Sequence, residues 1–263
     1  MKNLELLYTL TIPCLLTPAV HSIYPITTGK FRWEMLSGFC LLDIGLIVVT
    51  LILEAVCQCC NWRIFLTTYT SMSLLFATHV LLGEYVWPIM DLTSLASIAI
   101  HCSIFAGLAE EAVKLACWIP WIFVARRHKM DKNMLAFIAA LGALIFAAHE
   151  NFHMLAMIAT QASDIESIVP NVSIFDTLAQ VRVFLCPLLH IAFTMIGYSI
   201  WHIACAKRAS WAMYIFVPVV PAFLHGLYDF LLFADIPWFK HLAPVVALIT
   251  ILVNVLLGTP FIH

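Results

Sequence analysis

The chain has 263 residues, of which 63% are hydrophobic and 11% are charged, and its mean hydropathy is +0.99. A soluble domain of this length needs more polar surface, so the composition excludes a soluble globular protein and predicts a polytopic helical membrane protein. The net charge of −2 gives no sign of nucleic-acid binding. We therefore expect the lipid bilayer as a partner and no nucleic acid.

Apolar runs between charged residues, prolines and glycines predict about eight transmembrane helices and no strands. In chain order they cover residues 4–20, 36–57, 62–83, 92–125, 134–160, 178–206, 211–234 and 242–262. The segment 92–125 is longer than one crossing needs, so it is expected to begin at the interface and to enter the membrane core near Ile98. No repeat or linker interrupts the chain, which predicts an all-α bundle, a single integral membrane domain over residues 1–263.

The distribution of basic residues predicts the orientation of the bundle. With the first residue in the cytoplasm, eight Lys and Arg residues lie inside and three lie outside. This bias agrees with the positive-inside rule and places both termini in the cytoplasm. The glycosylation sequon at Asn171 then lies on the outer loop. Cys57, Cys59 and Cys60 lie at the inner end of the second helix, where they are small buried side chains or, alternatively, sites of lipidation.

Acidic and imidazole side chains occur at one depth in four of the later helices, each about sixteen residues from a basic cytoplasmic end. They are Glu110-Glu111, His149-Glu150-His153, His190 and His225-Asp229. A rise of about 1.5 Å per residue places them roughly 24 Å from the inner charged collar. An acid at the centre of a membrane helix costs roughly 2.5–3.5 kcal/mol. Because three of these helices carry acids at this depth and the fourth carries His190 there, the pattern indicates a reaction site inside the membrane.

The first of these motifs is GLAEEAVK, in which Lys114 lies four residues after Glu110 and three after Glu111. Either acid can meet the ammonium group on a helix face. Adjacent helical residues diverge by about 100°, so one glutamate can face a water molecule while the other is held by Lys114. The alternative is a buried ion pair that only fixes helix packing.

The second motif, FAAHENFHM, contains His149-Glu150-x-x-His153. This spacing puts two imidazoles one helical turn apart, where they can hold zinc while the glutamate activates a bound water. A third ligand at the downstream spacing of known zinc proteases is not evident. Both a metal site and a chance string of polar residues therefore remain open.

The last two motifs lie near prolines in the later helices. His190 follows Pro187, and Arg182 lies two turns earlier on roughly the same side of the helix. His225 and Asp229 are four residues apart, so the carboxylate can orient the imidazole or share a metal ion with it. A lone membrane histidine usually serves packing, but the common depth of these residues favours a functional role.

Taken together, Glu110-Glu111-x-x-Lys114, Phe146-x-x-x-Glu150-Asn151, Arg182 with His190, and His225-x-x-x-Asp229 resemble the motifs of the PrsW family of intramembrane proteases. The resemblance covers roughly residues 100–232, within a protease-like core of about 92–234. It implies hydrolysis of a peptide bond in a membrane-anchored protein substrate. By position, Glu110 and Glu111 match the paired acids of the family and His190 its third-motif histidine. His149 departs from the family, in which this position is usually apolar.

The residues and the resemblance predict one chemical outline. A water held between a glutamate and imidazoles, directly or through one divalent metal, attacks the peptide carbonyl. The expected catalytic residues are Glu110, Glu111, Glu150, His190 and His225. The candidate metal ligands, with zinc as the first choice of metal, are His149, Glu150, His153, His190, His225 and Asp229. The expected supporting residues are Lys114, Asn151 and Arg182.

Two functions of other classes also account for polar residues in a membrane bundle. A proton- or cation-coupled transporter would line its midplane with Glu, His and Asp, although paired broken helices and repeat symmetry would then be expected. A non-catalytic scaffold of a membrane protease complex is the second alternative. In a scaffold the paired acids would be expected to decay, whereas here they are intact.

Overall fold

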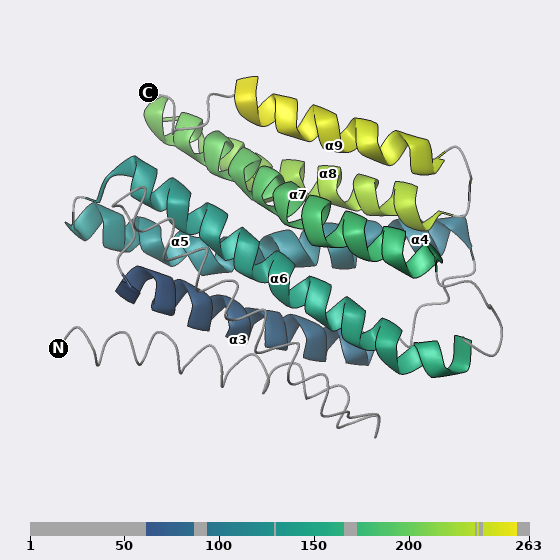
Figure 1. Ribbon diagram of the computed structural model, residues 1–263. Helices are drawn as coiled ribbons and strands as arrows, with labels where there is room; N and C mark the ends of the chain where they lie inside the picture. Colours follow the sequence, from purple (N-terminus) through teal and green to yellow (C-terminus); the bar gives the residue numbers. More distant parts are fainter. Residues whose placement is uncertain are drawn as a thin grey trace. The chain divides into compact units, whose positions relative to one another are not determined.

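The computed structural model describes residues 62–86, 94–128, 130–165, 173–234, 236 and 239–256. Within these ranges every regular element is a helix, which confirms the all-α prediction for this part of the chain (Figure 1). Several predictions fall outside the described residues: the helices 4–20 and 36–57, the roles of Cys57, Cys59 and Cys60, and the sequon at Asn171.

The helices follow the predicted order closely. They are α3 (Trp62–Val86), α4 (Leu95–His101), the π-helix η2 (Cys102–Ala109), α5 (Glu110–His128), α6 (Lys132–Ile165), α7 (Ser173–Ala206), the 3₁₀ helix η3 (Trp211–Ile215), α8 (Phe216–Phe233) and α9 (Phe239–Leu256). Most boundaries lie within a few residues of the predicted ones, because caps and apolar lengths are local properties of the sequence.

Five segments in the described part of the chain are long and apolar enough to cross a membrane. They are Arg63–Gly83, Leu95–His128, Lys132–Asn151, Leu185–Ala206 and Trp211–Phe233. α9 has a shorter apolar stretch, Leu242–Asn254. The protein is therefore an integral, multi-pass membrane protein, while the total of eight crossings and the cytoplasmic termini stay predictions.

The long segment predicted over residues 92–125 is continuous but not uniformly α-helical. It begins at Leu95, because the Ser94 side chain accepts a hydrogen bond from the Ser97 backbone N–H at 3.1 Å and caps the helix. The π-helical η2 then occupies eight residues immediately before Glu110. A π-turn holds more residues than an α-turn and so rotates every later side chain around the helix axis. The 3.6-residue pattern of the sequence does not reveal this change.

The chain divides into two compact units, which we describe separately. Among the described residues, the first unit comprises those from 62 to 77 and from 144 to 188, and the second comprises those from 78 to 143 and from 189 to 256. Helices α3, α6 and α7 each contribute to both units. The single domain over residues 1–263 stays a prediction.

In the second unit, α8 packs against η2 through two glycines. A Cβ atom on Gly226 of α8 would lie 2.8 Å from the backbone oxygen of Cys102, and one on Gly107 of η2 would collide with the backbone oxygen of Ala222. The missing side chains let the two backbones touch. This close approach brings the start of α5 beside His225, the residue that precedes Gly226.

Candidate active site

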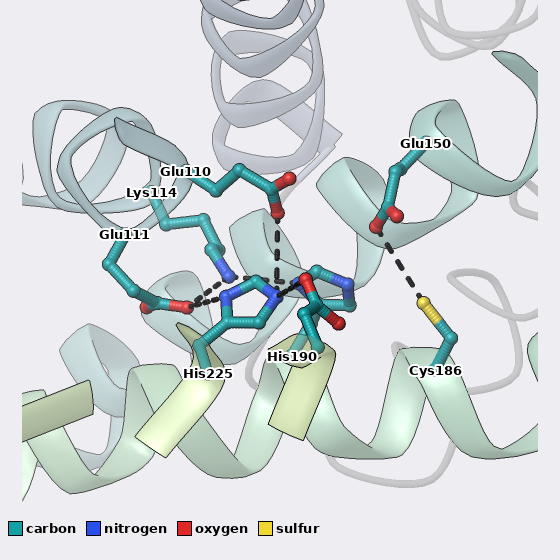
Figure 2. Close-up of polar contacts among 8 residues, drawn as sticks. Glu110, Glu111, Lys114, Glu150, Cys186, His190 and His225 are labelled. Atoms are coloured by element: carbon teal, nitrogen blue, oxygen red, sulfur yellow. Dashed lines mark hydrogen bonds and ion pairs between the residues drawn. The ribbon is translucent and has the colours of Figure 1, made fainter. Parts of the chain in front are cut away.

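The second unit gathers residues of three of the predicted motifs into one buried cluster (Figure 2). Glu110, Glu111 and Lys114 occupy the first turns of α5, His190 lies on α7, and His225 and Asp229 lie on α8. Four of these residues are each at most 3% exposed: Glu111, Lys114, His190 and His225. Buried charges and imidazoles persist in a core only when they satisfy one another, so their mutual contacts define the site.

Glu111 is the acid that orients His225. The His225 Nδ1–H donates to Glu111 Oε1 at 2.9 Å, and the Lys114 ammonium group donates to the same oxygen. A neutral imidazole that carries its proton on Nδ1 has an unprotonated Nε2. The Nε2 of His225 lies 3.7 Å from Glu110 Oε2 and 3.6 Å from Asp229 Oδ2. In a neutral His225, this nitrogen presents its lone pair between two carboxylates.

Ring contacts hold both histidines in place. The ring of His225 stacks on Phe193 with centroids 4.9 Å apart, and the His190 ring meets it edge-on at 5.0 Å. Lys114 Nζ lies 2.9 Å from His190 Nδ1. Sequence reasoning did not single out Phe193, although its position three residues after His190 places it on the same face of α7.

The cluster has the donor chemistry of a divalent metal site. One ligand atom from each of Glu110, His190 and His225 lies within 4.8 Å of the other two. One carboxylate and two imidazoles form a ligand set that catalytic zinc sites use, with a water in the fourth position. The Glu111 carboxylate on the far nitrogen of His225 is the partner that a metal-binding histidine normally has. By residue type and spacing, this set therefore fits a metal.

The first unit holds the second motif. The Cys186 thiol donates to Glu150 Oε2 at 3.7 Å (Figure 2). Asn151 is buried, and the His153 ring lies 6.3 Å from that of Phe76. Arg182 belongs to α7, but its side chain lies outside the described residues. The catalytic role of Glu150 and the supporting roles of Asn151 and Arg182 stay predictions.

His149 is completely buried in the first unit and has a partner that the sequence did not suggest. Its Nε2 lies 2.8 Å from Ser73 Oγ, and its ring stacks on Phe76 at 5.3 Å. The Ser73 hydroxyl donates its one hydrogen to the Tyr69 backbone oxygen at 2.9 Å, so the His149 Nε2–H is the donor to Ser73. This arrangement accounts for a buried polar group by packing and hydrogen bonding. Zinc binding by His149 and His153 stays a prediction.

The comparisons with known proteins agree with the motifs. The family model of the PrsW family intramembrane metalloprotease matches residues 33–257. The match extends well beyond the residues 100–232 that carry the recognisable motifs, and it includes the second and third predicted helices, which show none of them. Searches of curated proteins and of solved structures found no match.

Proposed function

Because the chain belongs to the PrsW family of intramembrane metalloproteases, we propose that it cleaves a membrane-anchored protein with water activated at the cluster of the second unit. The observation that carries this proposal is the orientation of His225. Glu111 directs its unprotonated Nε2 toward the space that Glu110 and Asp229 flank. A lone pair beside a carboxylate in a buried site is suited to hold and deprotonate a water molecule.

In this proposal Glu110 is the general base. The water donates its hydrogens to the Glu110 carboxylate and to Nε2 of His225, and its oxygen attacks the peptide carbonyl. Glu110 takes a proton from the water and passes it to the leaving amine as the C–N bond breaks. His225 keeps its orientation throughout, because Glu111 and the ring of Phe193 hold it.

A divalent metal, with zinc as the first candidate, would be held by Glu110, by Nε2 of His225 and by a third donor. With a metal bound, Nε2 of His225 would no longer accept a hydrogen from the water. His190 has a ligand atom within 4.8 Å of both, and Asp229 Oδ2 lies 3.6 Å from His225 Nε2, so these two residues are the candidates for that third position. When bound, the metal would polarise the carbonyl and acidify the water. One oxygen of Glu110 is sufficient for a ligand, which leaves the other to accept the proton.

Comparing membrane proteomes tests this function. Cells that express the wild-type chain are compared with cells that express Glu110→Gln and with cells that express Asp131→Asn. Asp131 is an exposed acid before α6, so its variant is a matched acid-to-amide control. We expect at least one membrane-anchored precursor to accumulate with Glu110→Gln and not with Asp131→Asn. Identical proteomes in all three strains, despite equal amounts of the chain in the membrane, would contradict proteolysis at this cluster.

A further inference from the structure

The ion pair of Lys114 and Glu111 contacts both histidines of the cluster, one through each partner (Figure 2). Glu111 Oε1 receives the Nδ1–H of His225 at 2.9 Å, and Lys114 Nζ lies 2.9 Å from Nδ1 of His190. All four residues lie in the second unit and are at most 3% exposed. The pair thereby links the start of α5 to α7 and to α8.

The two ends of the ion pair impose opposite demands on the two imidazoles. An ionised carboxylate only accepts hydrogen bonds, so the Nδ1 of His225 that meets Glu111 must carry a proton. An ammonium group only donates, so the Nδ1 of His190 that meets Lys114 must be unprotonated. A neutral His190 therefore carries its proton on Nε2, whereas a neutral His225 carries its proton on Nδ1.

The charge state of Lys114 follows from its surroundings. Glu111 is 2% exposed and shares one oxygen with the Lys114 amine. A carboxylate this deeply buried is costly unless an opposite charge compensates it. The Lys114 ammonium group contacts Glu111 directly, so it compensates this charge, and an ammonium group only donates hydrogen bonds.

We propose that Lys114 is a positioning residue that fixes His190 as an Nε2–H donor and thereby excludes it from the metal ligands. A metal-binding imidazole presents a bare nitrogen to the metal and donates its other N–H to an acceptor. His225 meets this condition because its Nδ1–H faces Glu111, but His190 does not because its Nδ1 faces a cation. A metal would then be held by Glu110 and by the bare nitrogen of His225, from which Asp229 Oδ2 lies 3.6 Å.

The tautomer gives His190 a definite task, and that task rests on the proposed function. Attack on a peptide carbonyl places negative charge on the carbonyl oxygen, and a fixed N–H group in a buried site stabilises it. His190 supplies this donor while His225 supplies the acceptor. The Lys114–Glu111 ion pair thus gives the two histidines complementary roles: His190 donates a hydrogen bond and His225 accepts one.

Nitrogen NMR of the full chain in lipid bilayers, labelled with ¹⁵N-histidine, tests the proposal directly. Protonated and unprotonated ring nitrogens have well-separated shifts, and His190→Gln and His225→Gln variants identify the two signal pairs. We expect His190 to be protonated at Nε2 and His225 at Nδ1 in the wild-type chain. His190 protonated at Nδ1 would overturn the proposal, even if every variant of Lys114 failed to fold.

A variant and an added metal extend the same measurement. In Lys114→Met, the Nδ1-protonated form of His190 should appear, whereas Lys132→Met, at the exposed start of α6, should leave the spectrum unchanged. Adding Zn²⁺ should leave the Nε2–H of His190 in place. An unaltered His190 signal in Lys114→Met, or loss of that proton on adding Zn²⁺, would overturn the proposal. Because no substrate is involved, absent proteolysis would refute the proposed function without changing this result.

Discussion

Replacing Glu111 by glutamine should separate the charge of the ion pair from its shape. The amide keeps an oxygen that can accept from Lys114 and His225, but it removes the negative charge. The Lys114 ammonium, 1% exposed, would then be a buried charge without its compensating carboxylate. Breaking a buried pair in this way costs about 3–5 kcal/mol, a large part of a typical stability of about 5–15 kcal/mol.

Thermal unfolding of the purified chain in detergent measures this cost. At roughly 2–4 °C per kcal/mol for a chain of this size, the midpoint of Glu111→Gln should fall by about 6–20 °C. The double variant Glu111→Gln/Lys114→Met removes both charges and should recover part of that loss, because no unpaired ion remains. Cleavage should be lost in both variants, while membrane insertion is retained. Asp131→Asn serves as the control, with a change within about 0.5 kcal/mol.

Two results would refute this reasoning about the ion pair. A wild-type unfolding midpoint for Glu111→Gln would show that the carboxylate charge does not compensate Lys114. A double variant less stable than Glu111→Gln alone would show that the ammonium is not the source of the cost. Wild-type cleavage by Glu111→Gln would remove Glu111 from the site.

Three further perturbations give distinct outcomes. Gly226→Ala places a methyl group 2.8 Å from a backbone oxygen of η2. Its unfolding midpoint should therefore fall by an amount equivalent to about 1–3 kcal/mol. The control Gly83→Ala, whose added Cβ has nothing within 4 Å, should not destabilise the chain. Ser73→Ala removes the hydroxyl that accepts from the buried His149 ring, so the stability measured by thermal unfolding should fall by about 1–3 kcal/mol. The folded variant should retain cleavage. Loss of cleavage without loss of stability would contradict a packing role for His149. His190→Ala should abolish cleavage of the accumulating precursor while extraction from membranes stays as in the wild type, and wild-type turnover would contradict its assignment.

The sequence alone predicted the features that depend on local helix geometry. The apolar runs gave the helices, since a segment that crosses lipid must satisfy its backbone internally. Spacings of three and four residues placed Lys114 within reach of either glutamate and His225 beside Asp229, and the structure has such pairs on α5 and α8. These contacts follow from the helical repeat, which is the same in any fold.

Only the tertiary structure decided which of the two glutamates contacts Lys114 and which histidine each member of that ion pair contacts. The sequence allowed either glutamate to meet Lys114, and the structure gives that contact to Glu111. Contacts of Glu111 with His225 and of Lys114 with His190 join residues far apart in the chain. They depend on how far α5 is rotated by the π-helical η2 and on how closely η2 approaches α8 at its glycines. Helix rotation and separation are set by packing between segments, so a periodic pattern within one segment cannot specify them.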